Sequence, residues 1–390
     1  MKGVCRVENH TYALVGNWRI QDGTKGFSVY SYDMETSHME CIHTILEHVS
    51  VGMQYLDEER GIVYVVDERG DSREQTGGGG YVLAIRIDRE NGHAELINEA
   101  SSLLPKPSYV WMDKSRKYLL VVHHLNDYYI NKIVRKEDGG YGSEVQYDDG
   151  GIVVFRLEED GSIGEICDVL IVKGERENPD HAVPHQHCIL ADSTGEIYAV
   201  CDKGLDKVFT FRLDRDKGKL CPLSRYPVKD GSAPRYCAFH PGKPFLFVDF
   251  EQLPEVHSFQ VDMASGELKL VGKAPLILEE TVLPDGIVLY AADIIVHPKG
   301  TYLYVSIRNA DMISVYDIKE DGSLRLKQNI SAGGIDPRGL CITPDERYLL
   351  VTHVRTADIG SFRIMEDGML TLTEEGAQAI RPGNIRIMEG

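Results

Sequence analysis

Ten side chains that could bind or transform a small polar molecule recur along this chain at two positions of a repeated pattern. The first position holds His187, Arg235, Asp293 and Arg338, and the second holds Trp18, Glu68, His124, Lys203, Glu251 and Arg308. A histidine or a carboxylate can act as a general base, and a guanidinium can bind a carboxylate or phosphate through two hydrogen bonds. If the fold brings these side chains together, they predict a site for a small polar ligand.

The pattern that spaces these residues is an internal repeat of strand-like segments. Each copy is an aromatic or aliphatic residue followed by a short run that ends in Val. The seven copies are residues 12–15, 62–65, 118–121, 197–200, 245–248, 302–305 and 348–351. Most copies follow another strand, and all precede an alternating segment such as KVFTFRLD, the period-2 pattern of a half-buried strand. With a weaker fourth strand and no long helical pattern, each unit is typical of a propeller blade.

The two ends of the chain predict how the ring of blades closes. The first copy, at residues 12–15, has no inner strand before it, whereas residues 384–388 have the pattern of an inner strand with nothing after it. Together these segments complete one blade, which removes both free sheet edges. We therefore predict an all-β fold in which residues 1–390 form a single domain, a seven-bladed β-propeller with four-stranded antiparallel blades.

The blade geometry predicts where the ten side chains lie. The start of the innermost strand and the end of the second strand emerge on the same face, so both positions line one mouth of the central channel. The long connections are expected to cover this mouth as well, because long loops gathered at one end of a fold usually serve binding or gating. These connections are residues 69–80, 125–150, 172–186 and 278–292.

Composition limits the class of ligand. The formal net charge of -19 disfavours nucleic-acid binding, which depends on Lys and Arg. An anionic ligand would therefore depend on a local basic cluster. No apolar stretch is long enough to span a membrane, and the N-terminal sequence lacks the apolar run of a secretory signal. Eight scattered cysteines without a CxxC pair fit reduced thiols, so we expect a cytoplasmic location.

Several motifs resemble the lactonase family of seven-bladed propellers, which includes bacterial propeller-type 6-phosphogluconolactonases and fungal 3-carboxy-cis,cis-muconate lactonizing enzymes. The motifs are the His-x-His of VPHQHC, the Ala-Pro-Arg of GSAPRYCAFHPG, the Glu of FVDFEQ, and an Ala-Ala-Asp followed by Arg-Asn. The resemblance covers essentially the whole chain. It implies an active site formed by His187, Arg235, Glu251 and Arg308. This chain departs from the family pattern at Phe250, His123, His124 and His353.

Hydrolysis of a lactone needs a base to activate water, donors for the developing oxyanion and groups that orient the substrate. In this reading Arg235 and Arg308 polarise the carbonyl and hold a carboxylate or phosphate, and His187 or Glu251 is the base. A carboxylate between two arginines has a lowered pKa and is a weak base, which favours His187. The further substrate-binding candidates are His185, Asp293, Arg338, His124, Lys203 and Glu68. The alternative is that Glu251 only forms structural ion pairs with the two arginines.

The leading hypothesis is a hydrolase that uses neither a metal nor a cofactor and opens a sugar lactone such as 6-phosphogluconolactone. Its ligand is then a small lactone or an anionic sugar acid, with no nucleic acid or membrane as a partner. The His-x-His of residues 185–187 is by itself a weak metal-binding pattern, because zinc sites usually combine several ligands with defined supporting groups. Two alternatives stay open, a muconate-type cycloisomerase and a non-catalytic propeller scaffold. The sequence leaves the oligomeric state and the role of residues 125–150 undetermined.

Overall fold

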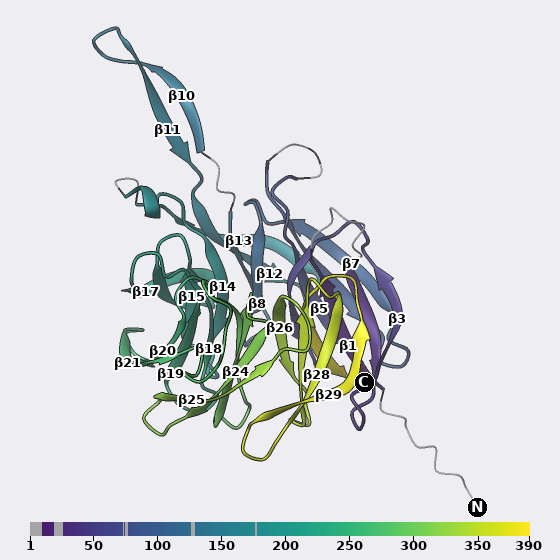
Figure 1. Cartoon of the computed structure of the whole chain (residues 1–390). Coiled ribbons are helices and arrows are strands. Elements are labelled where there is room, and N and C mark those ends of the chain that lie inside the picture. Colours follow the sequence, from purple (N-terminus) through teal and green to yellow (C-terminus); the bar gives the residue numbers. More distant parts are fainter. Residues whose placement is uncertain (1–9, 19–25, 73, 75–76, 126–128, 176–177) are drawn as a thin grey trace, which may run out of the picture.

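The computed structural model describes residues 10–18, 26–72, 74, 77–125, 129–175 and 178–390. Its strands form seven four-stranded antiparallel sheets arranged as blades around a central axis, which confirms the predicted seven-bladed β-propeller (Figure 1). Apart from the 3-10 turn η1 (Pro179–His181), these residues contain no helix. Nothing in the described part of the chain forms a helix long and apolar enough to cross a membrane.

Each blade runs from an inner strand at the channel to an outer strand at the rim. In this order, six of the blades are β4 (Val51–Asp57), β5 (Ile62–Asp67), β6 (Tyr81–Ile87) and β7 (Ala94–Ser101); β8 (Pro107–Met112), β9 (Tyr118–His123), β12 (Gly150–Leu157) and β13 (Ile163–Val172); β14 (Gln186–Ala191), β15 (Tyr198–Asp202), β16 (Lys207–Asp214) and β17 (Lys219–Pro227); β18 (Pro234–Phe239), β19 (Phe245–Phe250), β20 (Glu255–Val261) and β21 (Leu268–Pro275); β22 (Tyr290–Val296), β23 (Tyr302–Arg308), β24 (Met312–Ile318) and β25 (Leu324–Ser331); and β26 (Pro337–Ile342), β27 (Tyr348–His353), β28 (Asp358–Ile364) and β29 (Leu370–Gln378).

The seventh blade joins the two ends of the chain. Its inner strand is β30 (Pro382–Glu389), followed outward by β1 (Thr11–Asn17), β2 (Phe27–Tyr32) and β3 (Met39–Ile45). β1 and β30 pair antiparallel, with Tyr12 opposite Met388 and Val15 opposite Ile385. The predicted closure of the ring is therefore confirmed, and neither terminal strand is left as a free inner edge.

The apolar second strands pack between neighbouring blades. β5, β9, β15 and β27 are buried along their whole length, as expected for short continuous apolar runs. Outer strands such as β7 are largely exposed or half-buried. The inner strands contact one another around the ring in the order β30, β4, β8, β14, β18, β22 and β26. Residues at equivalent positions of these inner strands therefore lie at a similar level of the channel.

Residues 129–147, which the sequence analysis placed in a connection covering the mouth, instead form a separate β-hairpin. β10 (Tyr129–Arg135) and β11 (Tyr141–Tyr147) pair only with each other, and the hairpin projects away from the blades (Figure 1). The prediction of a covering loop is wrong for this segment. Its aromatic and β-branched residues favour strand pairing over an irregular loop.

Deletion of the hairpin is expected to leave the propeller intact. Ile133 and Tyr141 are 84% and 74% exposed, so little apolar area is lost with them. Replacement of residues 129–147 by a short Gly-Ser link should change stability by less than about 1 kcal/mol, which is a melting-point shift of about 2–4 °C at most. Circular dichroism melts of both proteins measure this. A loss of cooperative unfolding would show instead that the hairpin contributes to the fold.

Candidate active site

One mouth of the channel contains a cavity of about 680 Å³. Its walls are formed by Trp18, Ser50, Glu68, Arg69, Gly70, Lys106, His124, His187, Lys203, Arg235, Glu251, Arg308 and Arg338. We call this the mouth cavity. Nine of the ten side chains at the two repeat positions therefore lie together in this wall, and the exception is Asp293. Of the four long connections, only residues 69–80 contribute described residues to the wall.

Irregularities in the inner strands place His187 and Arg235. The pairing of β14 with β15 shifts register between Gln186 and Cys188, and the pairing of β18 with β19 shifts between Pro234 and Cys237. His187 and Arg235 lie inside these two shifts. Bulges of this kind re-aim a side chain and are common beside active sites.

A polar side chain on the second strand holds the backbone at the register shifts of three blades. Tyr236 N–H donates to Asp249 Oδ1 at 2.7 Å. In the next two blades the equivalent bonds run from Asp293 N–H to Ser306 Oγ and from Gly339 N–H to Thr352 Oγ1, at 3.0 and 2.8 Å. Each bond satisfies a buried backbone donor that the strand ladder leaves unpaired. The bulge that carries Arg235 is therefore a fixed part of the fold.

Glu251 is surrounded by three cations. Its Oε2 lies 2.6 Å from Lys203 Nζ, 3.2 Å from Arg235 Nε and 3.4 Å from Arg308 Nη2. Burial alone would raise the pKa of Glu251, but these three cations together lower it well below its ordinary value. Glu251 is therefore ionised at neutral pH. It is suited to hold the three cations in place and is a poor acceptor of a proton.

Arg235 is the central cation of this group. Its side chain is 1% exposed, and its guanidinium carbon lies 4.4 Å from the centroid of the Tyr236 ring. The Nη1 atom has no hydrogen-bond partner among the described residues. Because buried donors are normally satisfied, an acceptor oxygen from water or a ligand is expected there. Burial raises the pKa of the nearby Asp249 to about 8, so this carboxyl is largely uncharged at neutral pH.

His187 is a buried neutral imidazole. Its ring packs edge-on against the rings of His124 and Tyr236, at centroid distances of 5.5 and 5.1 Å. Burial, reinforced by the positive charge of Arg235, lowers the pKa of His187 well below 6.5. Its Nδ1 has no hydrogen-bond partner among the described residues. Near pH 7 this ring is therefore in the form that can accept a proton.

The opposite wall of the mouth cavity combines an indole, a carboxylate and a guanidinium. Trp18 Nε1–H donates to Glu68 Oε2 at 2.7 Å, and the guanidinium carbon of Arg338 lies 3.8 Å from the centroid of a Trp18 ring. Arg338 Nη2 is 4.0 Å from Glu68 Oε2. Burial raises the pKa of Glu68 in spite of the opposing effect of Arg338. This wall offers both donors and an acceptor to the hydroxyl groups of a ligand.

His185 lies behind the wall of the mouth cavity. Its ring stacks on that of His124 with centroids 4.8 Å apart, and its Nδ1 contacts the His124 carbonyl. His124 itself lines the cavity, with Nε2 3.5 Å from Lys203 Nζ. His185 is thus not part of the cavity wall and supports His124, and its contact with a substrate stays a prediction.

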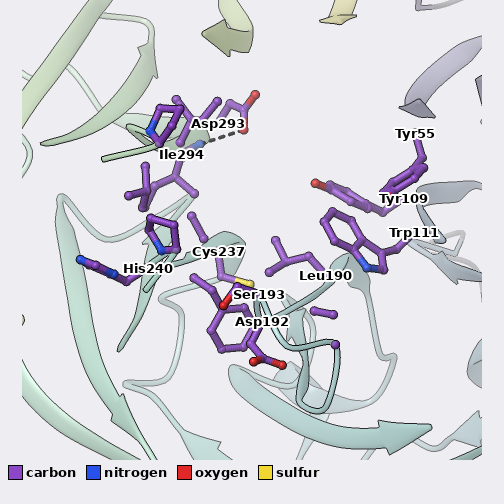
Figure 2. A pocket seen from close by; sticks show the side chains of 18 of the residues that line it. Tyr55, Tyr109, Trp111, Leu190, Asp192, Ser193, Cys237, His240, Asp293 and Ile294 are labelled. Atoms are coloured by element: carbon purple, nitrogen blue, oxygen red, sulfur yellow. Dashed lines mark hydrogen bonds between the residues drawn. The ribbon is translucent and has the colours of Figure 1, made fainter. Parts of the chain in front are cut away.

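Asp293 lies outside the mouth cavity and lines a second cavity of about 560 Å³, shown in Figure 2. This second cavity is bordered by turns between first and second strands, so it is at the other end of the channel. The two Asp293 oxygens accept hydrogen bonds from the N–H groups of Ile294 and Leu340, both at 2.8 Å. Burial raises the pKa of Asp293 to about 6. Its carboxyl joins neighbouring inner strands, and its predicted place at the mouth is wrong.

Lys106, Arg69 and Ser50 line the mouth cavity but do not belong to the two repeat positions. Lys106 immediately precedes β8, and Arg69 directly follows Glu68 and forms an ion pair with Asp67 at 2.6 Å. In the sequence, only their closeness to the repeat positions indicates that they line the same cavity. With them, six cations and two carboxylates line the mouth cavity of a chain whose net charge is -19. The mouth cavity is therefore a local basic site.

Two groups of side chains in the described residues could share a metal ion, and neither lies in the mouth cavity. One consists of Cys188, Cys201 and Cys237, and the other of His181, Asp206 and Asp230. In the second group, His181 Nε2 is 3.2 Å from Asp206 Oδ2, which also accepts the Gly231 N–H at 2.7 Å. That cluster is accounted for by hydrogen bonds that hold a connecting loop.

The sequence profile described as "Lactonase, 7-bladed beta-propeller" matches residues 13–387. The chain belongs to this lactonase family. It is 24% identical over 357 residues to a 6-phosphogluconolactonase of Bacillus subtilis, covering 90% of this chain and 91% of that protein. A 6-phosphogluconolactonase of Formosa agariphila is also 24% identical, with the same two shares covered.

Solved structures of related proteins have the same fold. The periplasmic gluconolactonase PpgL of Pseudomonas aeruginosa superposes with a TM-score of 0.80 at 20% identity, covering 97% of this chain and 99% of that one. A putative 6-phosphogluconolactonase of Bacteroides fragilis gives a TM-score of 0.78 at 22% identity, covering 99% of both chains. Family membership and the names of the two relatives support lactone hydrolysis as the reaction class of this chain.

Proposed function

We propose that this member of the lactonase family hydrolyses a sugar lactone that carries an anionic group, such as 6-phosphogluconolactone. The observation that carries the proposal is the mouth cavity, where a neutral buried imidazole lies among six cations. An acyl-transfer reaction needs a base and preorganised positive charge for the oxyanion, and this cavity supplies both. The names of the relatives point to the same chemistry.

His187 acts as the general base in the proposed mechanism. The neutral ring takes a proton from a water molecule while the water oxygen attacks the lactone carbonyl carbon. Arg235 and Arg308 stabilise the negative charge that develops on the carbonyl oxygen. When the carbon–oxygen bond of the ring breaks, the imidazolium returns its proton to the leaving ring oxygen. The product is a hydroxy acid, whose carboxyl loses a proton to solvent.

Glu251 and the opposite wall prepare the site for this reaction. The carboxylate of Glu251 keeps Lys203, Arg235 and Arg308 at short range and offsets their mutual repulsion. Glu68 and Arg338 bind hydroxyl groups of the sugar, and the remaining cations bind the anionic group.

The reaction as proposed uses no metal ion. Addition of EDTA should therefore leave the rate unchanged, and a rate restored only by a divalent ion would contradict this part of the proposal.

The direct test is hydrolysis of freshly prepared 6-phosphoglucono-δ-lactone, with correction for spontaneous opening. Glucono-δ-lactone and a muconolactone serve as comparison substrates. Faster opening of the phosphorylated lactone than of the other two supports the proposal. Turnover of the muconolactone alone would favour a cycloisomerase. No acceleration of any lactone by the folded protein would favour a non-catalytic propeller.

Lys106 is expected to contribute to recognition of the anionic group. It lines the mouth cavity, and its positive charge acts on Glu68 across that cavity. Loss of one charge-assisted hydrogen bond in Lys106→Ala should raise KM for the phosphorylated lactone about 10- to 100-fold and leave kcat nearly unchanged. Lys114→Ala, at the second cavity, is the matched control. Equal effects on phosphorylated and unphosphorylated substrates would assign Lys106 another role.

The pH dependence of the reaction should report the lowered pKa of His187. The base form is lost only when pH falls through that pKa, which burial and Arg235 place well below 6.5. kcat/KM should therefore be level from about pH 6.5 to 8 and decrease only at lower pH. Initial rates from pH 4.5 to 8 with glucono-δ-lactone avoid titration of a substrate phosphate. A half-maximal rate at or above pH 6.5 would contradict the assignment.

A further inference from the structure

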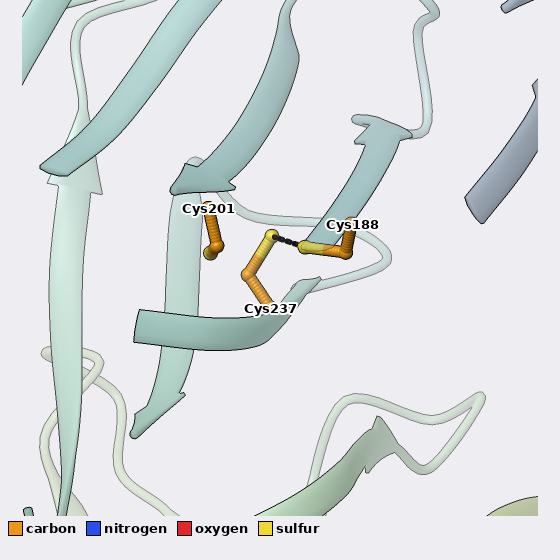
Figure 3. Close-up of side chains that lie close together, drawn as sticks. All are labelled: Cys188, Cys201 and Cys237. Atoms are coloured by element: carbon orange, nitrogen blue, oxygen red, sulfur yellow. Dashed lines mark hydrogen bonds between the residues drawn. The ribbon is translucent and has the colours of Figure 1, made fainter. Parts of the chain in front are cut away.

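Three cysteines lie together in the core between two adjacent blades (Figure 3). Cys188 on β14, Cys201 on β15 and Cys237 on β18 have Sγ atoms that all lie within 4.8 Å of one another. The closest pair, Cys188 and Cys237, has a sulfur–sulfur distance of 3.6 Å. All three are free thiols with exposed fractions of 0%, 0% and 3%. We call them the cysteine cluster.

The spacing of the cysteine cluster suits a single three-coordinate ion. Three sulfurs bound at about 2.3 Å, the length of a zinc–thiolate bond, would lie about 4 Å from one another in a planar complex and somewhat closer in a pyramidal one. The observed distances, 3.6 Å for one pair and at most 4.8 Å for the others, bracket this value. Only small side-chain adjustments are needed. Thiolate ligands of this kind select soft, thiophilic ions.

The surroundings of the cysteine cluster limit the charge and coordination number of such an ion. Among the described residues no further histidine, cysteine or carboxylate joins the three sulfurs. Structural zinc sites have four ligands, so zinc fits poorly. Three thiolates carry three negative charges, and a net charge in this apolar core would be costly. A trivalent ion that accepts only three ligands gives a neutral complex and meets both conditions.

The cysteine cluster also has an entry path. Cys237 lines the second cavity together with Leu190 (Figure 2). This cavity opens at the end of the channel opposite the mouth cavity. A small uncharged molecule can therefore approach the cluster without passing the proposed catalytic residues. An entry path is one of the features that a credible ion site needs.

We propose that Cys188, Cys201 and Cys237 form a binding site for a trivalent thiophilic ion of the arsenite class. Arsenous acid, As(OH)3, exchanges its three hydroxyl groups for three sulfur ligands. Each thiol proton leaves with one hydroxyl group as water, so three As–S bonds form, three As–O bonds break and three water molecules are released. No atom is oxidised or reduced. Binding links the inner strands of two blades and does not depend on the lactonase reaction.

The test is anaerobic titration of the reduced, full-length protein with sodium arsenite. Native mass spectrometry should show one arsenic per chain, and X-ray absorption at the arsenic edge should show three sulfur neighbours. Cys188→Ala, Cys201→Ala and Cys237→Ala should each weaken binding at least ten-fold. Cys41→Ala and Cys221→Ala, which remove exposed thiols, are matched controls and should bind as wild type does. Melting curves show whether each variant is folded.

Several results would overturn the proposal. One is the absence of bound arsenic on folded wild-type protein. Others are two sulfur neighbours in place of three, or full binding by a folded Cys201→Ala variant. The 3.6 Å pair could also serve redox chemistry. If arsenite fails to bind while a mild oxidant produces a Cys188–Cys237 disulfide, seen by peptide mapping, the cluster is a redox pair and the proposed ion site is wrong.

Discussion

His187→Ala is expected to lower kcat for lactone hydrolysis by about 10²–10⁴-fold, the usual contribution of a general base. The substitution removes a buried imidazole that is neutral near pH 7. Among the described residues of the mouth cavity, it is the imidazole that lies near both Arg235 and Lys203. KM should change little, because His187 is proposed to act on water and not on the anionic group. Initial-rate kinetics with 6-phosphoglucono-δ-lactone, corrected for spontaneous opening, measure both constants.

Two controls separate a catalytic from a structural role of His187. His187→Gln keeps a polar side chain of similar size but cannot act as a base, so it should be as inactive as His187→Ala. His185→Ala removes a ring that stacks on His124 behind the wall and should have a much smaller effect on kcat. Near-normal kcat in a folded His187→Gln variant would exclude the proposed base. Equal losses of kcat in His187→Gln and His185→Ala would indicate that the packed rings of His124, His185 and His187 have a structural role.

The ring and its site were predictable because the repeat specifies position relative to one axis. Residues that follow each Val by a fixed number of positions must lie at the same level and on the same face of neighbouring blades. For this reason the sequence alone groups Glu251 with Arg308. The closing blade was predictable for a similar reason, since two incomplete units at the ends fit together as β30 and β1.

What the repeat could not predict are departures from its regularity. The repeat groups Asp293 with Arg235, but the strand pairing places it level with Tyr236 and Gly339, one residue further along the inner strand, where it accepts the Leu340 N–H and faces the other cavity. Lys106 reaches the mouth cavity from a turn that no repeat position marks. The stacking of Arg338 on Trp18 depends on side-chain conformations across two blades. Spacing along the chain contains no information about these contacts.

The cysteine cluster could not be predicted from spacing along the chain either. Cys188, Cys201 and Cys237 are 13 and 36 residues apart in sequence and have no metal-binding spacing. They meet because β14 pairs with β15 and packs against β18. A sequence reading treats each as a small apolar residue of a buried strand, which is also true. Only the packing of two blades brings the three sulfurs together.

Arg235→Met is expected to lower kcat/KM by about 10²–10³-fold, equivalent to about 2.7–4 kcal/mol of transition-state stabilisation. Arg235 is the buried cation that contacts Glu251 and has an unsatisfied Nη1. The loss should be mainly in kcat, because the oxyanion forms only in the transition state. Arg235→Lys should remain impaired, since an ammonium keeps the charge but cannot reproduce the planar set of donors.

The fold should tolerate the Arg235→Met substitution, and this makes the test informative. Asp249, the acidic group nearby on β19, has a pKa raised by burial to about 8. Loss of Arg235 therefore does not leave a buried negative charge on Asp249 at neutral pH. Glu251 keeps Lys203 at 2.6 Å and Arg308 at 3.4 Å. Its pKa should rise, but it stays ionised at pH 7. A folded Arg235→Met variant with wild-type kcat would show that Arg235 and Glu251 only fasten neighbouring blades, which is the structural alternative to the proposed oxyanion role.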